Sequence, residues 1–176
     1  MHALTVRDCD ASSCRELPHF ESMRPVGLKY ASELPRCPQA CDCASHHEPR
    51  QLVAFRFVHN KATENDFLPL MKQPGSTESR GAPQCSNLAL SFFVSLKKAR
   101  DRVADLVSRG IDTHVRTGGY VGKLELITSD GHLSKRPNKR GHLNLFQEEG
   151  VLFADRVTEY HNAIAPKNKE AEHVAS

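Results

Sequence analysis

The sequence has no uninterrupted apolar stretch near the roughly 18 residues that a membrane-spanning helix requires. Its first residues also lack the cationic head and apolar core that mark a secretory signal. Neither sign of charge is in large excess: the sequence has 24 Lys and Arg residues and 21 Asp and Glu residues, and its formal net charge is +3. We therefore expect a soluble cytoplasmic protein with no membrane partner, and the total charge alone does not indicate nucleic-acid binding.

Proline is unevenly distributed and indicates where the folded part begins. Half of the ten prolines lie in residues 1–50, where no helical or alternating apolar pattern is sustained. Proline fixes its own φ and restricts the preceding residue, which disfavours a long helix or a central strand. We expect a largely irregular N-terminal tail over 1–50, one domain over 51–161 and a polar C-terminal tail over 162–176.

Apolar runs inside the expected domain predict several strands. Residues 52–58 and 88–94 are short runs rich in β-formers, and residues 120–127 alternate between apolar and polar side chains. Shorter strands are expected at 113–116, 142–146 and 151–153, the last two as a hairpin across 148–150.

One amphipathic helix is predicted over about 96–109. Its apolar residues recur at helical spacing, Ser95 precedes it as a candidate N-cap and Gly110 follows it as a stop. The order strand, helix, strands predicts the α+β class, with a small, mostly antiparallel sheet and this one main helix.

Five of the six cysteines lie before residue 50. In a reducing cytosol such a cluster is more often metal-binding, redox-active or inert than disulfide-bonded. Thiolates and imidazoles are ligands that zinc prefers, and the candidate ligands within positions 37–47 are Cys37, Cys41, Cys43 and His46. A structural zinc site is one interpretation, and a reduced tail without metal is the alternative.

A second set of polar residues is spread along the domain. Arg56 lies in the first expected strand, Ser91 lies in the second, and Gln147-Glu148-Glu149 comes before the run at 151–153. This order resembles the arginine, serine and Gln/Glu-x-Glu signature of mono-ADP-ribosyltransferase-like domains, over residues 52–157 at most.

The resemblance implies an NAD-dependent transferase, although the residues alone leave open whether the chain is an enzyme. It implies that Arg56 and the nearby His59 bind the phosphates of NAD, since a guanidinium forks onto phosphate oxygens. It further implies that Ser91 and Glu149 are catalytic, with Glu149 stabilising the oxocarbenium-like sugar. The alternative is that Arg56 pairs inside the fold with a carboxylate such as Glu125.

The charge is concentrated although its sum is small. Residues 80–140 hold twelve basic and five acidic residues, a net charge of +7, and residues 135–140 could contact phosphate. We expect the domain to bind a phosphate-bearing ligand near Arg56, Ser91 and this segment. The alternatives are a nucleic acid bound through residues 80–140 and a non-catalytic interaction module.

Overall fold

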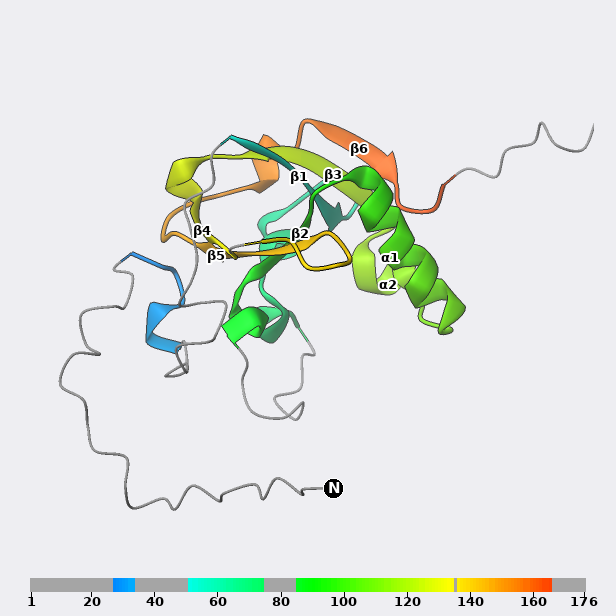
Figure 1. The fold of residues 1–176 in the computed structure, drawn as a ribbon, viewed down its shortest axis with the longest axis horizontal. Coiled ribbons are helices and arrows are strands. Elements are labelled where there is room, and N and C mark those ends of the chain that lie inside the picture. Colours follow the sequence, from blue (N-terminus) through cyan, green and yellow to red (C-terminus); the bar gives the residue numbers. More distant parts are fainter. Residues whose placement is uncertain (1–26, 34–50, 75–84, 135, 166–176) are drawn as a thin grey trace, which may run out of the picture.

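The fold is centred on one antiparallel sheet of six strands in the order β4-β5-β2-β1-β3-β6 (Figure 1). The computed structural model describes residues 27–33, 51–74, 85–134 and 136–165. Every neighbouring pair of strands is antiparallel, which confirms the predicted α+β class. The strands are β1 (Leu52–Val58), β2 (Leu90–Phe93), β3 (Tyr120–Leu126), β4 (Gly131–Leu133), β5 (His142–Gln147) and β6 (Glu159–Asn162).

The main helix, α1 (Leu96–Ser108), confirms the helix predicted over about 96–109. Ser95 is its N-cap, because its Oγ accepts a hydrogen bond from the backbone amide of Lys98 at 3.3 Å. Gly110 follows the last turn with φ +69°, a conformation that favours glycine. The apolar side of α1 packs on one face of the sheet, in a cluster of Phe93, Ala99, Val103, Val121 and Ala163.

The strand predicted at 113–116 is wrong, because a short helix, α2 (Thr113–Thr117), occupies this stretch. Asp112 Oδ1 accepts a hydrogen bond from the amide of His114 at 2.9 Å. Thr117 Oγ1 donates to the carbonyl of Thr113 at 2.6 Å. Such local bonds between side chains and backbone favour a turn of helix over an extended strand of so few residues.

The hairpin predicted across 148–150 is also wrong, because residues 151–153 form no strand. β5 pairs with β2 on one side and with β4 on the other. Phe153 is instead a core residue whose ring centroid lies 5.4 Å from that of Phe67 and 6.1 Å from that of Phe92. β3 pairs with β1 on one side and on the other with β6, a strand that the sequence did not predict.

The two faces of the sheet bury different side chains because neighbouring residues of a strand point to opposite sides. On β1, Ala54 and Val58 belong to a cluster that Phe67 and Phe153 cover. Phe55 and Phe57 pack against the cluster beneath α1. Full burial of one such ring contributes about 1.5–3 kcal/mol, so the sheet is stabilised from both sides.

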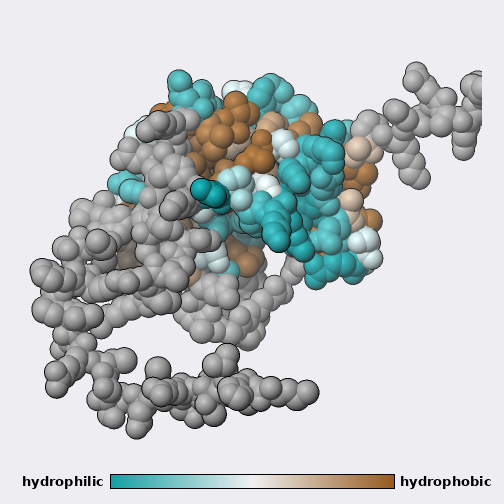
Figure 2. All heavy atoms as spheres, in the orientation of Figure 1, coloured by the Kyte–Doolittle hydropathy of each residue, from teal (hydrophilic) through white to brown (hydrophobic). Residues whose placement is uncertain are grey.

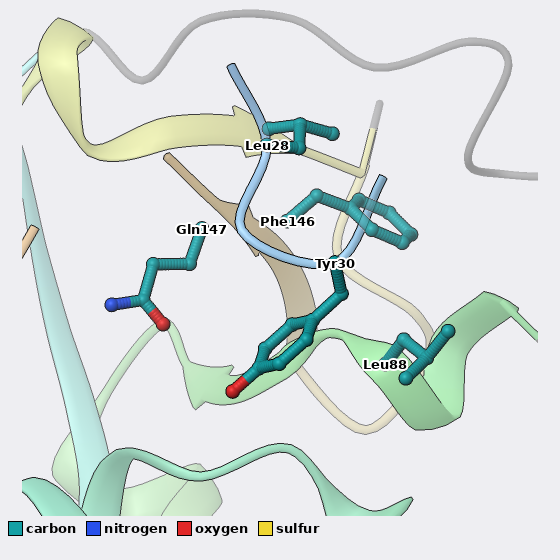
Figure 3. Close-up of a pocket in the computed structure, with 5 residues that line it drawn as sticks. All are labelled: Leu28, Tyr30, Leu88, Phe146 and Gln147. Carbon is teal, nitrogen blue, oxygen red and sulfur yellow. The ribbon is translucent and has the colours of Figure 1, made fainter. Parts of the chain in front are cut away.

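Residues 27–33 pack on the end of β5, although the sequence placed them in an irregular tail. Leu28 forms an isolated antiparallel bridge with Glu148, and the amide of Lys29 donates to the carbonyl of Gln147 at 2.9 Å. Figure 3 shows Leu28 and Tyr30 beside Leu88, Phe146 and Gln147, the residues that line a narrow pocket. The structure does not describe the rest of 1–50.

The C-terminal limit of the packed region lies slightly beyond residue 161. β6 extends to Asn162, and Ala163 is buried beneath α1. Among the described residues, no helix is both long and apolar enough to cross a lipid bilayer.

Cys85 is the one cysteine among the described residues, and it is buried and disulfide-bonded. The bond lies in a small cluster where Cys85 packs with Leu28, Ala89 and Phe146. The expectation for the cysteine cluster before residue 50 concerns residues outside the described part of the chain.

Candidate functional site

Arg56 is a buried cation in the middle of β1, with a relative exposure of 6%. Its Nε donates to the carbonyl of Asp66 at 2.7 Å, its Nη1 to that of Ser91 at 2.7 Å and its Nη2 to that of Leu68 at 3.1 Å. Burial lowers the pKa of the guanidinium to about 10, and the charge of Asp66 acts in the opposite direction. Arg56 is therefore protonated at neutral pH, and it is engaged with three backbone oxygens from two segments, the loop after β1 and β2.

His59 follows β1 and is held by the same loop. Its Nδ1 lies 2.5 Å from Oδ1 of Asp66, whose side chain is 4% exposed, whereas the His59 side chain is 65% exposed. Asp66 Oδ2 also accepts a hydrogen bond from the amide of Thr63 at 2.9 Å, which fixes the carboxylate. An ionised carboxylate can only accept a hydrogen bond, so Nδ1 carries the hydrogen. In the neutral imidazole, Nε2 then carries none and can itself accept a hydrogen bond. The sequence pointed to His59 but not to Asp66 as its partner.

Ser91 and Arg56 contact each other through the backbone of Ser91 only. The register of β1 and β2 pairs Phe55 with Phe93, which places Phe92 opposite Arg56. The guanidinium carbon accordingly lies 5.6 Å from the centroid of the Phe92 ring. Because side chains alternate along a strand, the Ser91 hydroxyl points to the other face of the sheet.

Glu149 lies away from both residues. Leu143 of β5 pairs with Phe92, and Glu149 is six residues further along the chain, beyond the end of β5. At about 3.3 Å per residue, this separation along the strand direction is roughly 20 Å. Glu149 is exposed, and its amide donates to the carbonyl of Gly27 at 2.7 Å. The fold thus brings Arg56 to the backbone of Ser91 and does not bring Glu149 to the same place.

The proposed zinc ligands Cys37, Cys41, Cys43 and His46 lie outside the described residues. Within the described part of the chain, no three His, Cys, Asp or Glu side chains gather closely enough to hold a metal ion.

A turn between β4 and β5 carries part of the basic segment that the sequence singled out. Asn138 Oδ1 accepts hydrogen bonds from the amides of Arg140 at 2.9 Å and His142 at 3.1 Å. The carbonyl of Gly141 accepts a hydrogen bond from the amide of Val94 at 3.0 Å, which connects the turn to the residues just before α1. The turn is thus held by its own hydrogen bonds and by its neighbour.

Lys98 of α1 lies beside the same turn. A Cβ built on Gly141 would lie 2.7 Å from Cγ of Lys98, so glycine leaves room for the lysine stem. Figure 2 shows hydrophilic side chains gathered over α1 and the neighbouring end of the sheet. We define the basic surface as Lys98, Arg136, Lys139 and Arg140.

Two other cations of α1 are paired with carboxylates of the same helix. Lys97 pairs with Asp101 at 3.0 Å, and Arg102 pairs with Asp105. None of the four residues of the basic surface forms an ion pair with another described residue. These four charges are therefore available to an external anion.

No protein-family model, curated protein or solved structure matches the chain. Of the two groups of side chains, the basic surface has three exposed cations and the half-buried Lys98, none in an ion pair with a described residue, whereas the donors of Arg56 already contact backbone oxygens.

Proposed function

We propose that the protein binds the phosphate groups of a nucleic acid through the basic surface. The observation that carries the proposal is the group of four cations around one ordered turn without an ion pair to any described residue. Lysine and arginine side chains in such an array bind phosphates and release the counterions that surround a nucleic acid.

The form of the basic surface favours an extended polyanion over a single small anion. Arg136, Lys139 and Arg140 are all exposed, and Lys98 approaches from a separate element. Cations displayed outward in this way can contact successive phosphates along a chain. The hydrogen bonds of Asn138 order the turn before binding, which reduces the entropy lost when a ligand is bound.

The proposal keeps the phosphate contact within the basic segment 80–140 and does not include Arg56 in it. A phosphate bound by Arg56 would have to replace carbonyl oxygens that hold two segments to β1. Loss of those bonds would leave buried polar groups without partners, at a cost of about 1–3 kcal/mol each. The basic surface requires no such rearrangement.

The first test measures the salt dependence of binding to a labelled oligonucleotide by fluorescence anisotropy. If all four cations contact phosphates, the logarithm of the association constant should fall with the logarithm of salt concentration with a slope of about −3 to −4. The double variant Lys139→Gln/Arg140→Gln should reduce the magnitude of that slope by about 2.

Lys61→Gln is the matched control, because Lys61 is an exposed lysine in the loop after β1 and is not part of the basic surface. It should leave the slope unchanged. Absence of binding at low salt, binding that salt does not weaken, or an equal loss in Lys61→Gln would overturn the proposal.

Incubation with labelled NAD separates two sources of phosphate. The transferase implied by the family resemblance predicts transfer of label from NAD and its loss in Glu149→Ala. That result, without oligonucleotide binding, would replace the nucleic-acid proposal with the enzymatic one.

A further inference from the structure

A second candidate site lies at the other end of β5, where residues 127–132 meet Glu148. A depression of about 650 Å³ opens there, within the roughly 300–1,000 Å³ that small-molecule sites occupy. The turn that carries part of the basic surface ends just before His142, the first residue of β5. The depression borders Glu148, which follows the last residue of β5, so the length of this strand separates the two regions. The polar side chains that line it belong to Gln51, Thr128, Ser129, His132 and Glu148.

One wall of the depression is a turn, Thr128–Asp130, that a partly buried ion pair between Asp130 and Arg156 holds in place. Asp130 is 1% exposed, and its Oδ2 accepts a hydrogen bond from the amide of Ile127 at 2.8 Å. Arg156 donates to both oxygens of Asp130, at 2.5 and 2.9 Å, and to the carbonyl of Glu125 at 2.6 Å. The positions of the two hydroxyl residues, Thr128 and Ser129, are therefore set before any ligand binds.

The position of Glu148 depends on the absence of a side chain at Gly27. The amide of Glu148 donates to the carbonyl of Asp130 at 3.0 Å, which continues the ladder between β4 and β5. Its carboxylate lies against Gly27, where an added Cβ would clash with Oε1 and where φ is +110°. The fold thus holds one carboxylate at the rim of the depression.

His132 shares this face of the sheet with Glu148. It pairs with Phe146 across the strands, so Glu148 is its diagonal neighbour on the same face. Such neighbours have their side chains within reach of one ligand, because their Cα atoms lie about 7–8 Å apart.

The backbone around the depression has a positive φ at two positions. Gln51 has φ +28° and is the only non-glycine residue with a positive φ among the described residues. Gly131 has φ +127°, and a Cβ there would clash with the carbonyl of Phe146. Unusual backbone conformations of this kind tend to cluster at binding sites, where the surrounding fold maintains them.

The charge of the lining indicates the chemistry of a ligand. Glu148 brings a carboxylate, and none of the described lining residues is a lysine or arginine. The hydroxyls of Thr128 and Ser129 and the amide oxygen of Gln51 can accept further hydrogen bonds, and Ile127 offers an apolar wall. An ammonium group donates three hydrogen bonds and accepts none, which matches a carboxylate surrounded by such acceptors.

We propose that this depression binds a small organic ammonium ion, with Glu148 as its charge partner and Ser129 as a hydrogen-bond acceptor. The apolar part of the ligand then lies along Ile127. This site is distinct from the basic surface, because the length of β5 lies between them.

The test uses butylamine, which is an ammonium ion at neutral pH, and butanol, which has the same chain without the charge. Amide resonances of the full-length protein are followed by NMR during titration at constant ionic strength. Butylammonium should shift the resonances of Ser129, Gly131 and His132 in a saturable way. The dissociation constant of butanol should be at least about tenfold higher than that of butylammonium, because butanol lacks the charge-assisted hydrogen bond.

Glu148→Gln keeps the size of the side chain and should weaken butylammonium binding by about tenfold or more. Glu149→Gln is the matched control, since Glu149 is the neighbouring carboxylate and does not line the depression. Ser129→Ala is a second variant at an exposed position and should weaken binding without changing the fold. Equal affinity for butanol, equal losses in Glu148→Gln and Glu149→Gln, or shifts that do not saturate would overturn the proposal.

Discussion

Arg56 shows how a charged residue can be a structural part of a strand. Moving a guanidinium out of water is costly, and the cost is offset only when hydrogen bonds and nearby charge replace the lost hydration. Three carbonyl oxygens, the charge of Asp66 and the faces of Phe67 and Phe92 surround this group. Arg56 thereby joins β1, β2 and the loop after β1.

Arg56→Lys should lower the free energy of unfolding by about 3 kcal/mol, because one ammonium cannot reproduce three forked bonds. Urea unfolding followed by circular dichroism measures this change. Arg100→Lys is the control, since Nε and Nη2 of Arg100 both donate to the carbonyl of Asn162, an exposed residue. It should cost less than about 1 kcal/mol, and equal losses in the two variants would contradict a structural role for Arg56.

His142 should make the stability depend on pH. Burial lowers its pKa, and the charges of Arg56 and Arg102 lower it further. The unfolded chain therefore binds a proton first, near its ordinary value of about 6.5, and stability falls as the pH drops below that value.

The measurement is the urea midpoint between about pH 7.5 and 5.5, around the ordinary histidine pKa. His142→Gln should flatten the decrease, whereas His114→Gln, at an exposed position, should leave it as in the wild type. A decrease of the same size in His142→Gln would mean that another group is responsible.

Only part of the residue-level site was predictable from the sequence. The composition of 52–58 placed Arg56 in a strand, and the structure has β1 over the same residues. Its partners were not predictable, because they are backbone oxygens that depend on how the loop after β1 folds back. The alternation of Ser91 and Phe92 could have shown that the serine hydroxyl and Arg56 face opposite sides, once their pairing was known.

At the scale of elements, long patterns were predictable and short ones were not. The helix α1 has several turns of apolar periodicity together with a cap and a stop, and each signal favours the same structure. By contrast, α2, β4 and β6 have five, three and four residues, too few to display a period. Their structure is decided by neighbouring elements and by local hydrogen bonds.

The turn between β4 and β5 should act as a positioning element for the basic surface. Asn138→Ala removes the acceptor that orders the amides of Arg140 and His142 without changing any charge. We expect oligonucleotide affinity to fall by a factor of about 5, corresponding to roughly 1 kcal/mol, while the salt slope stays unchanged.

Anisotropy titrations at several salt concentrations check this expectation. Asn60→Ala, at an exposed position after β1, is the control and should bind as the wild type does. A reduced salt slope in Asn138→Ala would contradict a purely geometric role, because the slope counts phosphate contacts.

At the scale of the whole molecule, the net charge is small, but basic and acidic side chains lie in different regions of the fold. The basic surface lies before the first residue of β5, and Glu148 and Glu149 follow its last residue. The sequence showed this difference as +7 in residues 80–140 and a net charge of −3 in residues 141–176. The structure adds that one strand connects the two ends, which is why the two proposed ligands carry opposite charge.

The borders of the sheet have a consequence for behaviour at high protein concentration. Its outermost strands, β4 and β6, have only three and four residues. Long outer strands with unpaired N–H and C=O groups recruit strands from other molecules and begin aggregation, whereas short or charged ones do not. Glu159 and Lys123 form an ion pair at the β6 border. We therefore expect the sheet edges of the described residues to pair poorly with strands of other molecules.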